Sequence, residues 1–190
     1  MKHDVALTEA EISQIDARVL VVDDNRELWH NYDEVLALQR SPVSEELQQL
    51  VRTVFDYKEH EVHDNYLFNS ITLDYSHTAT DANNKIDAAY VNGKPYHVIF
   101  IDVQMPPDVD GITATRQIWE KHPEQQIILC TAYSKYTFAE INKVLQSRRH
   151  NLLMMRKPFD AESVRLITQS QIINAELVWR QAFSSGKNND

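Results

Sequence analysis

The segment HVIFIDVQMPPDVDG, residues 97–111, gives the strongest indication of the fold. Its apolar run at 98–101 is typical of a parallel strand covered on both faces, and the prolines and glycine of residues 106–111 predict a turn straight after it. Asp102 therefore ends a predicted buried strand. Ligands bind at this end of the strands in open α/β sheets, so Asp102 is a candidate reactive residue, although an acid that opens a turn is also ordinary turn chemistry.

Predicted strands and helices alternate on both sides of this stretch. Apolar or β-branched runs bounded by turn residues predict strands, and apolar residues at helical spacing predict helices. Strands are expected at 18–22, 66–75, 97–101, 126–130 and 152–155, and helices at 26–41, 44–60, 81–92, 112–121, 138–146 and 160–183. Asn25 is expected to cap the first helix, and Asn92-Gly93 to end the helix at 81–92. The alternation predicts an α/β fold with a doubly wound parallel sheet.

The composition argues against several classes of protein. The chain has 190 residues, 43% hydrophobic and 25% charged, which suits one soluble domain, and no apolar run is long enough to cross a membrane. A formal net charge of -9 argues against direct nucleic-acid binding, which needs clustered Lys and Arg. A single cysteine, Cys130, and the lack of an export signal favour a cytoplasmic location. Trp29 and Trp119 are expected to pack helices.

Four of the predicted strands end on residues that suit one reaction. Asp23 and Asp24 follow the first strand, Asp102 the third, Thr131 the fourth and Lys157 the fifth. A parallel sheet gathers these strand ends along one edge, so we expect the residues to lie together. Crowded carboxylates repel each other unless a cation shares them, and Mg2+ is the expected ion. A carboxylate beside it can attack a phosphoryl group, whose oxygens the lysine and the threonine would stabilise.

These motifs resemble the receiver domain of two-component response regulators. The resemblance covers about residues 18–173 and rests on VVDDN (21–25), IDVQMPPDVDG (101–111), CTAYS (130–134) and KPF (157–159). It implies a flavodoxin-like, five-stranded parallel sheet in the order 2-1-3-4-5. It also implies no enzyme activity beyond Mg2+-dependent self-phosphorylation and dephosphorylation.

The resemblance implies a role for each residue at the strand ends. Asp102 would be the phosphoacceptor, and Thr131 and Lys157 would contact the phosphoryl group, with the Lys157–Pro158 peptide bond in the family's cis form. The implied ligands of Mg2+ are the side chains of Asp23, Asp24 and Asp102 and the main-chain carbonyl of Gln104.

The chain departs from the family pattern in several ways. Asp24 and Asp102 are separated by about 30 residues more than the intervening elements need, and we place the excess in a helical insertion at 41–65, before the second strand. Met154 stands where the family usually has an aromatic residue that moves with the threonine, so the output switch is expected to be altered. The loop MPPDVDG is also longer than the family's usual loop.

The segments that flank the domain suggest its partners. We expect an arm or partial helix at 1–16, the receiver domain at 17–173, and at 174–190 a helix extension with a disordered tail toward an output domain outside this chain. The chain looks most like N-terminal receivers of hybrid histidine kinases or cyclic-dinucleotide enzymes. This implies a histidine kinase or phosphotransfer protein as phosphodonor and a homodimer through the last helix, for which a plain core helix is the alternative.

Two other functions stay open on the sequence alone. A receiver fold used only for docking or dimerisation would not need the full set of acids. A phosphatase that works through an aspartyl intermediate would need a second acid two residues after the nucleophile, where this chain has Gln104. The complete acidic set therefore favours a phosphoacceptor receiver.

Overall fold

The computed structural model describes residues 6–37, 67–105, 109–132, 141, 143, 145 and 151–186. The strands are β1 (Asp16–Val22), β2 (Ser70–Ser76), β3 (Val98–Asp102), β4 (Gln126–Thr131) and β5 (Leu152–Arg156). The helices are α1 (Glu9–Ile12), the 3-10 turn η1 (Arg26–Leu28), α2 (Trp29–Ala37), α4 (Ala79–Val91), α5 (Gly111–Lys121) and α7 (Ala161–Gly186). The predicted insertion at 41–65 and most of the predicted helix at 138–146 lie outside the described residues.

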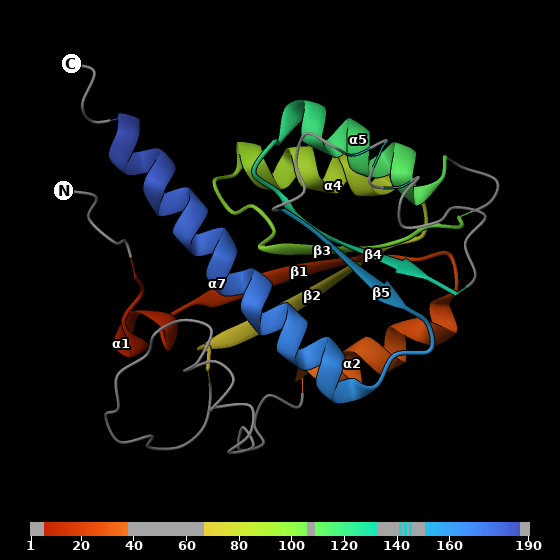
Figure 1. The fold of residues 1–190 in the computed structure, drawn as a ribbon, viewed down its shortest axis with the longest axis horizontal. Helices are drawn as coiled ribbons and strands as arrows, with labels where there is room; N and C mark the ends of the chain where they lie inside the picture. Colours follow the sequence, from red (N-terminus) through yellow and green to blue (C-terminus); the bar gives the residue numbers. More distant parts are fainter. Residues whose placement is uncertain are drawn as a thin grey trace.

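The strands form a single parallel sheet in the order β2-β1-β3-β4-β5, which confirms the predicted flavodoxin-like topology (Figure 1). The inner strands β1, β3 and β4 are apolar on both faces because helices cover both, and every residue of β4 is buried. The edge strands β2 and β5 are less buried. The inner strands therefore form the rigid base whose ends carry the candidate residues.

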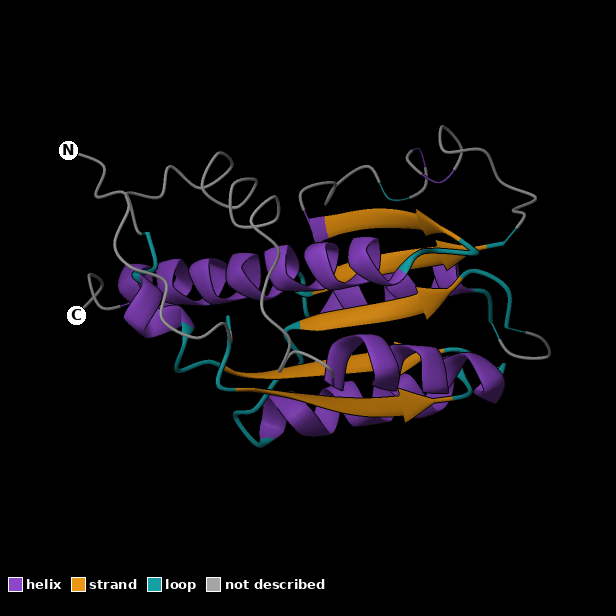
Figure 2. Ribbon diagram, turned by 90° about the horizontal axis from the view of Figure 1, so that it is seen from below, coloured by secondary structure: helices purple, strands orange, loops and turns teal. Residues whose placement is uncertain are grey.

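Helices cover the two faces of the sheet in pairs (Figures 1 and 2). α4 and α5 pack on one face, and α2 and α7 pack on the other. Because side chains alternate along a strand, each buried run supplies two cores. On β3, for example, Ile99 belongs to the core under α4 and α5, whereas Phe100 belongs to the core under α2 and α7. None of the described helices is long and apolar enough to span a membrane.

Short polar side chains set where the helices begin. The predicted cap at Asn25 is confirmed, since its side chain accepts a hydrogen bond from the Glu27 backbone N–H (3.1 Å), although the chain first forms η1 before α2. Asp110 caps α5 in the same way, through the Thr113 N–H (2.7 Å). Gly93 follows α4 with φ +66°, a left-handed conformation that glycine adopts without strain, as the Asn92-Gly93 pair predicts.

The long helix α7 is tied to the amino ends of the strands. His97 accepts a hydrogen bond from the Arg18 backbone N–H at Nδ1 (3.1 Å), so its Nε2 carries the proton and donates to Glu176 (3.1 Å). Two residues before Glu176, Asn174 donates to the side chain of Gln126 (2.9 Å). These contacts fix the position of α7 along the direction of the strands.

The N-terminal segment packs against the same core as α7. Thr8 and Glu11 form a capping box that starts α1, although the helix is very short. Leu7, Ile12 and Ile15 are buried in the core on the α7 side. At the far end of this contact Arg180 of α7 pairs with Glu11 (2.7 Å). Residues 7–15 are therefore part of the packed unit.

We predict that Ile12→Ala lowers the free energy of unfolding by about 2–5 kcal/mol, because it empties a buried site between α1 and the core. Gln14→Ala, a truncation at an exposed neighbouring position, is the control and should cost less than about 0.5 kcal/mol. Urea denaturation followed by circular dichroism measures both. Equal effects in the two variants would contradict the packing of α1.

Candidate functional site

Strand register places the predicted residues along one edge of the sheet. Val22, the last residue of β1, pairs with Ile101 of β3, so Asp23 continues the chain at the level of Asp102. The last residue of β4, Thr131, lies one step beyond the partner of Asp102. Parallel pairing thus brings together residues that are far apart in sequence, as predicted.

Lys157 reaches across this edge from the end of β5. Its backbone N–H donates to the Thr131 carbonyl (2.7 Å), and the Lys157–Pro158 peptide bond is cis, as the resemblance implies. Its Nζ lies 2.6 Å from Oδ2 of Asp23 and 3.4 Å from Oδ2 of Asp102. β3 and β4 separate β5 from β1, so the side chain spans two strands. One ammonium group therefore lies against two of the three acids.

Asp23 is held by contacts from several elements. It is 1% exposed, and its backbone N–H donates to the Ser76 carbonyl at the end of β2 (3.0 Å). Oδ1 accepts a hydrogen bond from the Asn25 N–H (2.9 Å), and Oδ2 accepts one from Lys157. A buried carboxylate needs such partners because burial without them is costly. The acidic turn after β1 is therefore already arranged before any ligand binds.

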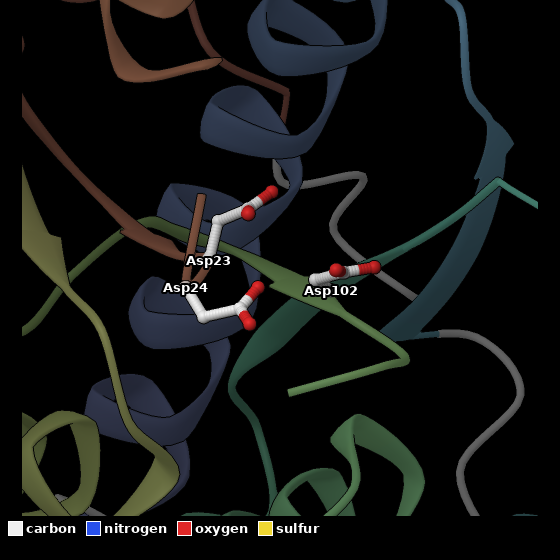
Figure 3. Close-up of side chains that lie close together, drawn as sticks. All are labelled: Asp23, Asp24 and Asp102. Atoms are coloured by element: carbon white, nitrogen blue, oxygen red, sulfur yellow. The ribbon is translucent and has the colours of Figure 1, made fainter. Parts of the chain in front are cut away.

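The three acids form a set of oxygen donors that suits a divalent cation. Asp23, Asp24 and Asp102 each offer one carboxylate oxygen, and these oxygens all lie within 4.8 Å of one another (Figure 3). Asp23 is buried, Asp102 is half-buried and Asp24 is exposed, so the set opens to solvent on one side. Hard cations such as Mg2+ prefer carboxylate and carbonyl oxygens and keep some of their water. The residues present therefore fit the predicted ion.

Burial sets the electrostatics of this edge. Desolvation raises the pKa of Asp102 above its ordinary value, and the charge of Asp23 adds to the rise, whereas Lys157 and a hydrogen bond from the Gln104 backbone oppose it. For Lys157, burial acts to lower the pKa, but the hydrogen bond and the charge of Asp23 outweigh it and raise the pKa. The lysine therefore stays protonated, and a carboxylate with a raised pKa is more basic than an ordinary one.

Thr131 offers a buried hydroxyl to the same site. The residue is 8% exposed, and its Oγ1 has no hydrogen-bond partner among the residues that the structure describes. A buried hydroxyl without a partner costs about 1–3 kcal/mol, so proteins usually give it one. An oxygen-rich ligand at the edge of the sheet would supply the missing partner.

Gly111 allows α5 to start close against the reactive strand. A Cβ added at this position would lie 2.2 Å from the Asp102 carbonyl oxygen, which is far inside van der Waals contact. The Gly111 N–H donates to the Val103 carbonyl (3.1 Å), which holds the two segments together. The glycine of the motif at 97–111 is therefore required by a close approach of backbone to backbone.

Two other residues named in the sequence analysis, Cys130 and Met154, pack in or against the core. Cys130 is 1% exposed, and burial raises the pKa of its thiol to about 12, so it is an inert core residue. Met154 is partly buried against the core on the α4–α5 side. The metal-ligand role of the Gln104 carbonyl stays a prediction, as do the roles of Pro106 and Pro107, which lie outside the described residues.

The sequence did not reveal how Trp29 takes part in the site. It was expected to pack helices, but its ring stacks against Tyr75 and His77, which lie at the end of β2 and just after it, and its indole N–H donates to the Asp23 carbonyl (3.2 Å). Only the position of Trp29, six residues after Asp23, hints at this contact, because it puts the ring beside the acidic turn once η1 forms.

Comparison with protein families gives one match. A model described as the response regulator receiver domain matches residues 60–169, more than half of the chain. The matched residues include Asp102, Thr131 and Lys157, and they begin after Asp23 and Asp24. No curated protein matches the chain.

Solved structures with the same fold are receiver domains with low sequence identity. One is a CheY-like receiver domain protein from Methanospirillum hungatei JF-1 (14% identity, 85% of this chain and 98% of that chain, TM-score 0.57). Another is the signal receiver domain of an HD domain-containing protein from Pseudomonas fluorescens Pf-5 (13%, 92% and 95%, 0.55). A third is the BeF3-activated receiver domain of DrrB from Thermotoga maritima (21%, 83% and 98%, 0.52). These likenesses show the fold.

We predict that Thr131→Val leaves the free energy of unfolding unchanged or raises it by about 1 kcal/mol, because a methyl group of similar shape replaces a buried hydroxyl that no residue in the described part of the chain pairs with. Thr115→Val is the matched control. Its buried hydroxyl donates to the Gly111 carbonyl (2.7 Å), so the same change should cost about 1 kcal/mol. Chemical denaturation without added metal compares the two. A loss at Thr131 as large as at Thr115 would mean that the Thr131 hydroxyl has a partner.

Proposed function

The chain belongs to the response regulator receiver domain family, and on this premise we propose that Asp102 accepts a phosphoryl group from a phosphohistidine in a two-component pathway. The observation that carries the proposal is the position of Lys157, whose ammonium group lies against both Asp23 and Asp102. A buried lysine shared by two acids at a strand edge is costly as mere scaffolding. It suits a site where phosphoryl oxygens are to be bound.

The transfer is a direct displacement. An oxygen of the Asp102 carboxylate attacks phosphorus, the new O–P bond forms as the N–P bond of the donor breaks, and the electron pair of that bond stays on the imidazole nitrogen. Lys157 and the Thr131 hydroxyl would each bind an oxygen of the phosphoryl group, which would give Thr131 the partner that it lacks among the described residues. The raised pKa of Asp102 supports its role as nucleophile, since a more basic carboxylate shares its electrons more readily.

Mg2+ would be held by Asp23, Asp24, Asp102 and the Gln104 main-chain carbonyl, and when bound it would supply positive charge opposite the phosphoryl oxygens. Asp23 is fixed by Asn25 and Lys157, so it orients the donor set. Asp24 is exposed and leaves the site open to a donor protein.

The output is proposed to leave the site through Thr131 and β5. A phosphoryl group draws the Thr131 hydroxyl toward it, and the space that this vacates is open to Met154, a flexible side chain two strand positions before Arg156. We place the receiver domain at 17–173 and take 174–190 as its connection to an output domain or to a second copy of the chain. A histidine kinase or phosphotransfer protein in the cytoplasm is the proposed donor.

Docking without phosphorylation is the alternative function. The long helix α7 would serve it equally well, because its 26 residues extend past the sheet. A docking module, however, would have no use for three acids and a lysine at the other end of the strands. The phosphoacceptor function accounts for both features.

We predict that a small phosphodonor such as acetyl phosphate adds one phosphoryl group to the chain in the presence of Mg2+ and none in excess chelator. Asp102→Asn should abolish the addition, because its side chain is a much poorer nucleophile. Asp87→Asn, the same change at an ion-paired aspartate on α4, is the control and should label normally. Intact-protein mass spectrometry measures the addition.

Equal labelling in chelator, or full labelling of Asp102→Asn, would contradict the proposal. Labelling of neither protein under any condition would favour the docking function.

A further inference from the structure

Trp29 makes an unusual set of contacts for a partly exposed residue at the start of a helix. Its ring stacks against those of Tyr75 (centroids 4.7 Å apart, planes at 18°) and His77 (4.6 Å, 10°). The guanidinium of Arg26 lies 5.7 Å from the same ring. Stacked rings of this kind hold their partners in one orientation. The indole is therefore fixed at the carboxyl end of β2, next to the acidic turn.

The polar end of this fixed ring contacts the acidic turn itself. The indole Nε1–H donates to the main-chain carbonyl of Asp23 (3.2 Å). That carbonyl belongs to the peptide unit that joins Asp23 to Asp24, and a peptide unit is planar. A hydrogen bond that fixes the carbonyl oxygen therefore fixes the plane of this peptide unit, and with it the orientation of the Asp24 backbone. The Asp23 N–H is held separately by Ser76 of β2 (3.0 Å).

We propose that Trp29 is a positioning residue for the metal ligands: its indole N–H orients the Asp23–Asp24 peptide so that both carboxylates face Asp102. The proposal rests on the proposed function of the acidic site. Asp23 has further contacts through its side chain, whereas Asp24 is exposed and depends on the backbone for its direction. The stack with Tyr75 and His77 also couples the end of β2 to the site.

Two substitutions in the same ring stack distinguish a role of Trp29 in positioning the metal ligands from a role in packing α2 alone. Trp29→Phe keeps an aromatic ring but removes the N–H that reaches Asp23. Tyr75→Phe also keeps the ring, and it removes a hydroxyl that donates to Asp33 (2.6 Å) and lies 3.3 Å from the Trp29 carbonyl oxygen. Each variant loses hydrogen bonding at the start of α2, Trp29→Phe to the turn after β1 and Tyr75→Phe between β2 and α2, but only Trp29→Phe loses the contact with the metal ligands. Trp179→Phe, at the far end of α7, controls for the loss of an indole.

Isothermal titration calorimetry of the full chain with Mg2+ alone tests the proposal. Trp29→Phe should weaken Mg2+ binding roughly two- to tenfold, the effect of one lost hydrogen bond. Tyr75→Phe and Trp179→Phe should bind as the unchanged chain does, whatever their thermal stability. Asp24→Asn removes a proposed ligand, so the loss of Mg2+ affinity in this variant shows how large the effect of a direct ligand change is.

A second readout needs no variant. The indole N–H proton of Trp29 should shift in the NMR spectrum as Mg2+ is added, while those of Trp119 and Trp179 stay in place, because only Trp29 is bonded to a ligand residue. Unchanged Mg2+ affinity in Trp29→Phe, equal losses in Trp29→Phe and Tyr75→Phe, or a stationary Trp29 resonance would overturn the role of Trp29 alone. Absence of Mg2+ binding in the unchanged chain would overturn the metal site and this inference together.

Discussion

The ion pair between Lys157 and Asp23 is the interaction on which the carboxyl edge of the sheet depends. It joins the last strand to the first positions after β1, and Asp102 and Thr131 lie on the two strands between. Both partners are largely buried, and losing one partner of a buried pair costs about 3–5 kcal/mol because the other charge is left alone. The pair is compatible with folding only if β1, β3, β4 and β5 end at the same level. The strand register provides this, and the same register assembles the acids.

Much of this arrangement could be predicted from the sequence because it follows from short-range patterns and one rule of topology. The buried runs that become β1, β3 and β4 are nearly continuous in apolar residues, and each is closed by a polar residue, which ends β3 and β4 and directly follows β1. Once the strands are parallel, Asp23, Asp102 and Thr131 must meet. The exposed edge strand β2 was harder to delimit because its residues alternate poorly: it was predicted at 66–75 and lies at Ser70–Ser76.

Contacts between side chains and distant backbone could not be predicted in this way. The burial of Leu7, Ile12 and Ile15 depends on how far α7 extends beyond the sheet, which no local pattern near these residues reveals. The hydrogen bond from Trp29 to Asp23 depends on η1, which turns the chain before α2 begins, and on rings supplied by β2 and the residue that follows it. Sequence patterns reveal the periodicity of a single helix or strand. Such contacts depend instead on how two elements pack against each other, which the periodicity does not specify.

The carboxyl edge of the sheet is proposed to hold a divalent ion in a single site made of three acids and one lysine. Anomalous scattering from crystals grown with Mn2+, which carboxylates bind much as they bind Mg2+, tests this proposal most directly. We predict an Mn2+ peak in contact with carboxylate oxygens of Asp23, Asp24 and Asp102, with Lys157 retained beside the acids. A fully ordered acidic edge with no Mn2+ peak between these residues, at a concentration that saturates other carboxylate sites, would contradict it.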